Sequence, residues 1–378
     1  MASLARITAI ARKEFLHIAR DWRILVSVLV VPLVMLILFG YAISFDVRNI
    51  PIVVLDQDHT AASRAYTGAA ENTGFFRSVG AVSDMAGVNA AFDQGLARAA
   101  IIVAPGYANE IAAGRQGRVA VLVDGSEPNS AQLGQAYAIA LNNVLSRQVL
   151  VTWASNRGAS LAGVGQLEPR LRAWYNPEGR SADFLIPGLM VVIIMIVTVQ
   201  QTSVTLVRER ESGTLEQLMQ SPLTQSELIL GKVAPWAILA FADTIGIVIA
   251  AILVFQIPLR GDLTVLGVGM FLFIVCCLSI GLIVSAVSPS IESANMIALL
   301  VSFLPGFMLS GLAFPLASIP PVLQFVSLLF PGRYMVEIAR GAFLRGTSWD
   351  ALGIQVLWLA IYAAIGLGLA SVLNRRKA

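Results

Sequence analysis

Long stretches without a charged side chain constrain this chain more than any other feature. Residues 24–45 are 22 consecutive uncharged residues, and residues 184–207 are another 24. At 1.5 Å per residue the shorter stretch makes a helix of about 33 Å, long enough to cross the hydrocarbon core of a bilayer. Only 13% of the 378 residues are charged and 57% are hydrophobic, which is outside the range of soluble proteins. The sequence therefore predicts an α-helical membrane protein.

Six transmembrane helices are expected in total. Beyond residues 24–45 and 184–207, the other four fall at residues 233–257, 263–287, 293–311 and 351–373. The uncharged run that begins at residue 293 continues to residue 332 and contains five prolines, so it is too long and too broken for one span. Non-helical backbone at membrane depth is tolerated only when it is buried in protein or faces water. We therefore expect a broken, partly re-entrant segment over residues 312–346, within a transmembrane domain over residues 183–378.

The region between the first two spans, residues 46–182, has a different character. Short β-like runs alternate there with helical ones, and this alternation predicts an α/β domain with a mixed sheet. The expected strands cover residues 50–56, 75–82, 99–104 and 118–124, with a last one at residues 170–175. Asp56, Asp58 and Asp124 stand at strand ends, where we interpret them as turn and cap residues. No catalytic motif is present, and the few His and Cys residues are placed unfavourably for a metal site, so we expect no enzyme.

Residues 1–23 predict a basic amphipathic helix of the kind that lies in the membrane interface. On a helical projection the apolar side chains share a wedge of about 80° and the basic ones lie on another side. The interface residues proposed on this basis are Arg12, Lys13, Phe15 and Trp22. A helix packed against another domain is the alternative. A cleaved signal peptide is not expected, because the apolar run that follows is too long.

The distribution of basic residues predicts the orientation. The N-terminal helix, residues 208–232 and the C-terminal tail together carry 11 Arg and Lys, whereas the short segments on the opposite side carry four. The positive-inside rule then places both termini in the cytoplasm and residues 46–182 outside it. The expected location is the inner (cytoplasmic) membrane.

Residues 208–232 are the long polar run between two spans. Gly213 permits a bend, Thr214 with Gln217 resembles a capping box, and Pro222 ends the short helix between them. We expect Ser226 to cap the helix that follows. A short amphipathic helix suits insertion into a groove on a soluble partner. From chemistry alone, a solvated loop is an equally good interpretation.

The same run resembles the signature of ABC-2-type transporter permeases. The matching positions are Glu209, Arg210, Glu211, Gly213, Thr214, Leu215, Glu216, Gln217, Leu218, Ser221, Pro222, Glu227, Gly231 and Lys232. In that family this loop carries the coupling helix that contacts the nucleotide-binding subunit. The resemblance therefore implies an ATPase-coupling site made of all these positions except Arg210, Gly231 and Lys232. It extends over nearly the whole chain, and the large domain after the first span resembles the drug-exporter branch of the family.

The chain itself carries no Walker A motif, because Ser226 and Val233 stand where that motif requires Gly and Ser or Thr. No cofactor is expected on this chain, and ATP and Mg²⁺ are expected on a separate ATPase subunit. Six spans make half of a pathway, which implies a second permease subunit in a homo- or heterodimer. A periplasmic adaptor protein and membrane lipids are further candidate partners, and no nucleic acid is expected.

The predicted function is that of a permease subunit in an ATP-driven export system for amphiphilic substrates, such as drugs or lipids. The alternative is a membrane-anchored interaction or receptor protein that moves no solute. Two acidic residues leave their own alternatives open. Asp243, in the middle of a span, has two interpretations. It is either a polar contact in the substrate path or in a proton-coupled step, or a group that forms a helix–helix hydrogen bond, and we favour the hydrogen bond. Glu292 is either a second ATPase contact or a helix cap.

Overall fold

The computed structural model describes residues 2–42, 49–126, 128–156, 174–176, 180–213 and 224–375. The chain divides into two compact units. The first contains residues 1–44 and 173–378, and the second contains residues 45–172. Each unit has its own buried core, and the two are described separately.

The first unit is a helical bundle. Its elements are α1 (Ala2–Arg20), α2 (Trp22–Leu25), the π-helical turn η1 (Val26–Val30), α3 (Val31–Ala42), α8 (Ser181–Glu211), α10 (Gln225–Leu253), α11 (Leu263–Val287), α12 (Ile291–Met308), the 3₁₀ turn η2 (Leu316–Ser318), α13 (Pro321–Leu328), α14 (Pro331–Arg340), the π-helical turn η3 (Gly341–Arg345) and α15 (Trp349–Arg375). Within the described residues, six helical stretches are long and apolar enough to cross a membrane. They agree with the helical membrane protein that the sequence predicts.

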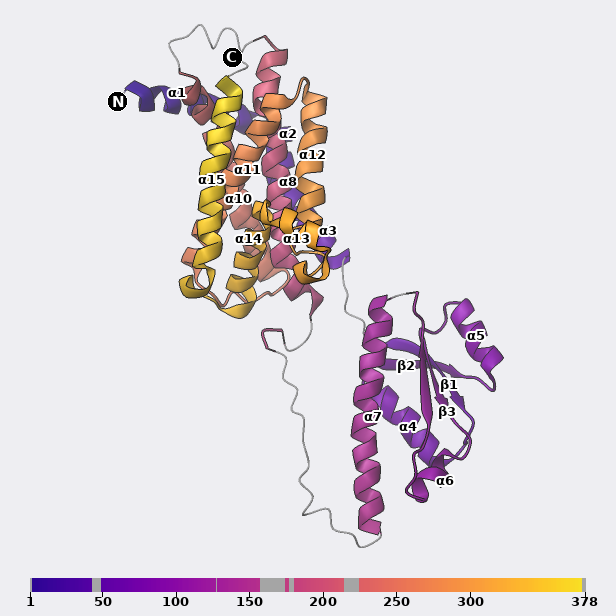
Figure 1. The fold of residues 1–378 in the computed structure, drawn as a ribbon. Coiled ribbons are helices and arrows are strands. Elements are labelled where there is room, and N and C mark those ends of the chain that lie inside the picture. The colour runs from indigo at the N-terminus through magenta and orange to yellow at the C-terminus, as the bar shows by residue number, and fades with distance from the viewer. Residues whose placement is uncertain are drawn as a thin grey trace. The chain divides into compact units, whose positions relative to one another are not determined.

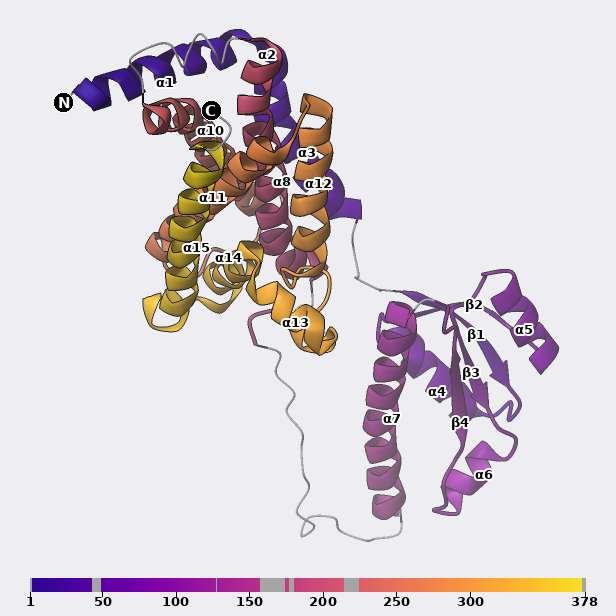
Figure 2. The ribbon, with the colours of Figure 1, turned by 45° about the horizontal axis from the view of Figure 1, so that its top comes forward.

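Figures 1 and 2 show that the two chain termini lie at the same end of this bundle, where α1 runs crosswise to the long helices. Helix α8 forms the centre and packs against α3, α10, α11, α12 and α14. Its residues from Leu185 to Ile196 are buried on every side and are entirely apolar apart from the backbone. A helix that is hydrophobic all round belongs inside a bundle, so the second span of the chain is its core.

At the opposite end of the bundle, α13 and α14 are joined at a bend of 86° (Figure 1). Pro321 and Pro331 occupy the first turn of these two helices, where a missing N–H is tolerated. The carbonyl oxygen of Leu328, at the bend, accepts hydrogen bonds from the hydroxyls of Tyr334 (3.0 Å) and Tyr362 (2.8 Å). Side chains from α14 and α15 thus satisfy backbone that the break leaves without a helical partner.

The second unit is built on a four-stranded sheet. Its elements are β1 (Ile50–Asp56), α4 (Ala61–Asn72), β2 (Phe76–Ala81), α5 (Met85–Asp93), β3 (Ala99–Val103), α6 (Tyr107–Ala112), β4 (Val119–Val123) and α7 (Pro128–Asn156). The strand order is β2-β1-β3-β4, with β1 parallel to both neighbours and β4 antiparallel to β3. The sheet is therefore mixed, and it partly bears out the predicted α/β domain. Residues 170–173 of the fifth predicted strand lie outside the described residues.

Both faces of the sheet are covered. Along β1, Ile50 and Ile52 pack on one face in a cluster that includes Tyr66 of α4 and Leu141 of α7. Val53 and its neighbours on the other face pack against α5. This alternation follows the two-residue period of a strand.

The strand-end aspartates bind neighbouring groups, as expected of turn and cap residues. The Asp56 carboxylate accepts hydrogen bonds from the backbone N–H groups of Asp58 and His59, both at 3.0 Å, and from the Ser63 hydroxyl at 2.7 Å. Asp124 accepts hydrogen bonds from the backbone N–H and the hydroxyl of Ser126, and it forms an ion pair with Arg98. Their oxygens hold the ends of β1 and β4 in place.

Candidate functional site

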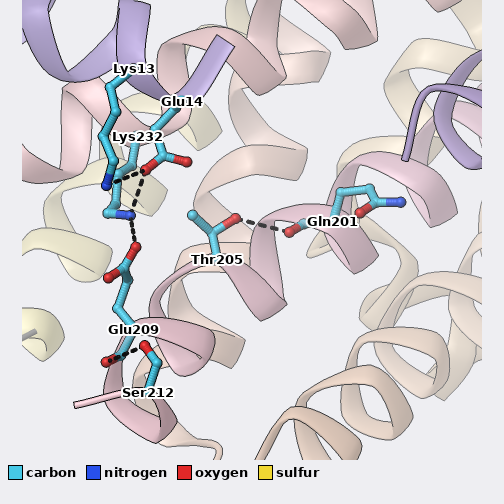
Figure 3. Close-up of polar contacts among 7 residues, drawn as sticks. All are labelled: Lys13, Glu14, Gln201, Thr205, Glu209, Ser212 and Lys232. Carbon is cyan, nitrogen blue, oxygen red and sulfur yellow. Dashed lines mark hydrogen bonds and ion pairs between the residues drawn. The ribbon is translucent and has the colours of Figure 1, made fainter. Parts of the chain in front are cut away.

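The ends of three helices meet around the side chain of Lys232 (Figure 3). Lys232 lies in the second turn of α10 and is 2% exposed. Its Nζ lies 2.9 Å from Oε1 of Glu14 on α1 and 2.5 Å from Oε1 of Glu209 on α8. One ammonium group thus joins three helices, although Glu14 and Lys232 are 218 residues apart in the sequence.

Burial makes this cluster energetically important. The Glu14 and Glu209 side chains are only 12% and 16% exposed. Removing one member of a buried ion pair leaves an uncompensated charge, at a cost of about 3–5 kcal/mol. A cavity of about 120 Å³ adjoins the cluster and is lined in part by Thr205 and Trp236. It has room for a few water molecules, which would hydrate the charges that the three helices bring together.

Helix α1 packs closely on α10. Gly231 has no side chain, and the Ile10 side chain occupies the space beside it. Ile18 on the same face of α1 is 2% exposed. An outer ion pair between Arg6 and Glu227, at 3.8 Å, adds a contact nearer the N-terminus. The helix is therefore fixed to the bundle along its length.

The predicted interface residues lie on the remaining surface of α1 and at the start of α2. Arg12 and Lys13 are exposed, as are Phe15 (43%) and Trp22 (68%). Asp21 separates the two helices by accepting hydrogen bonds from the backbone N–H groups at the start of α2. Nζ of Lys13 also lies 4.0 Å from Oε1 of Glu14. This exposed surface carries both basic and aromatic side chains, a combination typical of helices that lie in a membrane interface.

The end of α8 is attached to the turn between α11 and α12. Arg210 donates a hydrogen bond to the carbonyl oxygen of Ser285, and Oε1 of Glu211 accepts one from the backbone N–H of Ile291 at 2.9 Å. Gly213 follows with a φ of +70°, a left-handed conformation that favours glycine. Glu292 lies in the first turn of α12, but the side chain that caps this helix belongs to Ser290.

Helix α10 begins two residues earlier than expected. Thr224, rather than Ser226, is its N-cap residue. The Thr224 hydroxyl accepts from the N–H of Glu227 at 3.4 Å, and Oε2 of Glu227 accepts from the N–H of Thr224 at 2.8 Å. This reciprocal capping box needs an acidic or amide side chain three residues after the cap, and Glu227 supplies it only for Thr224.

The middle of the predicted coupling site lies outside the described residues. This applies to Thr214, Leu215, Glu216, Gln217, Leu218, Ser221 and Pro222. The structure places Glu209, Glu211 and Gly213 before this gap and Glu227 after it. Both flanks are thus anchored to the bundle, through α8 and α10.

Asp243 lies apart from this cluster. It follows Lys232 by 11 residues on the same helix, which corresponds to about 16 Å along the helix axis. The residue is 3% exposed, and its Oδ1 has no hydrogen-bond partner among the residues that the structure describes. This oxygen does not form the helix–helix hydrogen bond that we favoured from the sequence.

Sequence reasoning missed the joining role of Glu14 and Lys232. Lys232 entered only as the end of a motif, and Glu14 did not enter at all. A signal was present, because Glu14 is the one acidic residue among the first 20 positions of an otherwise basic helix. An isolated acid on such a helix indicates a basic partner elsewhere.

The chain is similar to several known proteins. Residues 22–372 match the model of a family described as "ABC-2 family transporter protein". The chain is 28% identical over 377 residues to "Probable multidrug ABC transporter permease YbhS" of Escherichia coli, covering 99% of this chain and 98% of the relative. It is 25% identical to "Probable multidrug ABC transporter permease YbhR", covering 98% and 99%. It is also 28% identical to "Inner membrane transport permease YhhJ", covering 82% and 80%.

Proposed function

Because this chain belongs to the ABC-2 family of transporter proteins, we propose that it couples ATP hydrolysis on a separate ATPase subunit to the export of amphiphilic substrates. It is a multi-pass inner-membrane permease subunit, and its family implies an ABC ATPase partner. The relatives named as multidrug permeases favour drug-like amphiphiles as the substrates. The observation that carries the coupling proposal is the buried Lys232, which joins α1, α8 and α10.

The proposed mechanism follows from that connection. Residues 208–232 contact the ATPase, and closure of the ATPase pushes on this loop and on α1. Because Lys232 ties Glu14 to Glu209, the push reaches the ends of α8 and α10 together. Glu211 carries it further to the first turn of α12 through the backbone of Ile291. Displacement of these spans against those of a second permease subunit then opens a path for the substrate.

The proposed topology places the termini and residues 208–232 in the cytoplasm and the α/β unit outside. The shared end of the termini in the bundle (Figure 1) supports a common side for both, and the basic residues favour the cytoplasm for it. The α/β unit is then available to a periplasmic adaptor protein. In this proposal α1 lies at the headgroup level of the membrane, which the exposure of Arg12, Lys13, Phe15 and Trp22 supports.

The test is purification of the tagged chain from its native membrane, followed by mass spectrometry and ATPase assays. Wild type should retain an ABC ATPase, and Glu216→Arg combined with Leu218→Asp should lose it. Glu71→Arg combined with Leu96→Asp, in the α/β unit, is the matched control and should retain it. An ATPase that stays bound to the loop variant contradicts the coupling site. Reconstituted wild-type complex whose ATPase is not stimulated by any amphiphile contradicts the export function.

A further inference from the structure

A groove of about 680 Å³ lies between the bent pair α13–α14 and helix α15. Its volume falls within the range of small-molecule sites. Three isoleucines one to two turns apart on α15 line it, and all three are open to the surroundings: Ile354 (55% exposed), Ile361 (38%) and Ile365 (65%). In a membrane protein, such an apolar and open wall meets the acyl chains of lipids.

Aromatic rings form the floor of the groove. The ring of Tyr334 on α14 stacks on that of Trp358, with centroids 6.1 Å apart and planes at 22°. It also contacts Tyr362 at a centroid distance of 6.1 Å. The Trp358 side chain remains 44% exposed and offers part of its surface to the groove. Aromatic faces attract ammonium groups, and Trp and Tyr are typical of the headgroup level of a membrane.

Two opposite charges line the same groove one helical turn apart. Arg333 donates from Nη1 to the Ser327 hydroxyl at 2.6 Å and to the carbonyl oxygen of Gln324 at 3.4 Å. Both acceptors are neutral, and no acidic side chain in the described part of the chain lies within ion-pair distance of Arg333. Glu337 follows four residues later and pairs with Arg345 at 2.9 Å. That pair is about half exposed on both sides and is therefore weak.

Gln355 adds an acceptor at the same level as Glu337. Its Oε1 is buried and has no donor among the described residues, although the side chain lines the groove. A buried acceptor without a donor costs free energy. The antiparallel packing of α14 on α15 places Glu337 and Gln355 toward the turn that joins the two helices, and Ile361 and Ile365 lie farther from that turn along α15. A ligand with N–H donors at that end would satisfy Gln355.

We propose that this groove is a resident binding site for a phospholipid with a primary ammonium headgroup, of the phosphatidylethanolamine class. The lipid phosphate binds Arg333, whose planar guanidinium suits a phosphate. The ammonium lies one helical turn farther along α14, nearer the membrane surface. It donates to Glu337 and to Oε1 of Gln355, next to the Trp358 ring. An acyl chain follows Ile361 and Ile365. The order of the charges along α14 matches the order of phosphate and ammonium in this headgroup.

Lipid binding to the purified full-length chain tests the proposal. Native mass spectrometry in detergent would measure the binding of phosphatidylethanolamine, phosphatidylcholine and phosphatidylglycerol with identical acyl chains. We expect one tight site per chain that prefers phosphatidylethanolamine about tenfold, since one charge-assisted hydrogen bond is worth about that factor. Phosphatidylcholine lacks N–H donors, and phosphatidylglycerol lacks the cation.

The variants separate the two ends of the headgroup. Arg333→Gln should weaken the binding of all three lipids about tenfold, because they share the phosphate. Glu337→Gln should remove the preference for phosphatidylethanolamine over phosphatidylglycerol and leave phosphatidylglycerol binding unchanged. Arg333→Lys, which keeps the charge, guards against a loss that comes only from misfolding. Arg260→Gln and Asp350→Asn change exposed charges that do not line the groove and should bind as wild type does.

Three results would overturn the proposal. Equal binding of the three lipids would indicate an unspecific lipid shell. Unchanged lipid preference in Glu337→Gln would remove the ammonium site. A disulfide between two chains through Ile365→Cys in native membranes would show that a second copy covers the groove. None of these readouts depends on an ATPase or on transport, so they are distinct from a failure of the proposed function.

Discussion

Gly231 and Ile10 approach so closely that a Cβ on the glycine would lie 2.7 Å from the Cβ of Ile10. A larger side chain must therefore push α1 away from α10. We expect Gly231→Leu to lower the stability of the chain by about 1–3 kcal/mol, as overpacking does in cores, and to weaken ATPase binding. Thermal unfolding in detergent and co-purification measure the two effects.

Gly267→Leu is the control for this variant. Gly267 likewise lies in the second turn of its helix, α11, and a Cβ there would meet no atom within 4 Å. The same change in helix propensity thus occurs without a clash. Equal stability of the two variants would contradict the close packing of α1 on α10.

Lys232→Met should be strongly destabilising, since it leaves the carboxylates of Glu14 and Glu209 buried and without the ammonium. The expected loss is about 3–5 kcal/mol. The triple variant with Glu14→Gln and Glu209→Gln removes all three charges and should recover most of that loss. A double-mutant-cycle analysis of thermal stability measures the coupling. Additive effects of the three substitutions would mean that the side chains act independently.

Asp243→Leu should make the chain more stable. The Oδ1 atom of this buried aspartate has no hydrogen-bond partner in the described residues, and replacing such a group with an apolar one relieves a cost of about 1–3 kcal/mol. Unfolding temperature and export rate should be measured together. Higher stability with lost export assigns Asp243 to the substrate path, whereas Asp243→Asn with full export excludes that role. Lower stability would mean that the carboxyl group has a partner in the assembled transporter.

The α/β unit should lose part of its stability in acid at the end of β4. The hydroxyl and backbone N–H of Ser126, and then the Arg98 guanidinium, lower the pKa of Asp124 from its ordinary 3.8 to about 2. Because the folded-state pKa is the lower one, these contacts stabilise the fold fully above 3.8, and the stabilisation is lost as the pH falls through about 2.

Hydrogen exchange of the β3 and β4 amides in the full chain, corrected for the intrinsic effect of pH, measures this loss. Asp124→Asn keeps an oxygen acceptor but cannot titrate, so its protection should fall less than that of wild type over the same interval. Identical pH profiles of wild type and Asp124→Asn would contradict the assignment.

The elements of the fold were accessible from the sequence because they depend on local pattern. The strand run at residues 50–56 alternates between two covered faces, and its bounds agree with β1. The uncharged run at residues 263–287 likewise has the bounds of α11. Burial in a sheet restricts a short run of residues to mostly apolar side chains, and burial in a membrane does the same for a much longer run.

The site was less accessible, because it depends on contacts between distant segments. Nothing near Glu14 in sequence indicates that its partner is Lys232, 218 residues away. The start of α10 was misplaced for a more local reason. Both Thr224 and Ser226 are good cap residues, and only the reciprocal bond with Glu227 decides between them.

The carbonyl oxygen of Leu328 accepts hydrogen bonds from two phenolic hydroxyls, those of Tyr334 and Tyr362. A carbonyl has two lone pairs, so either hydroxyl alone would still leave it satisfied. The bend between α13 and α14 is therefore redundantly secured, and mutation to phenylalanine should be tolerated at one of the two positions but not at both. During evolution, either tyrosine can be replaced only while the other is retained. Variation at positions 334 and 362 should therefore be correlated among relatives.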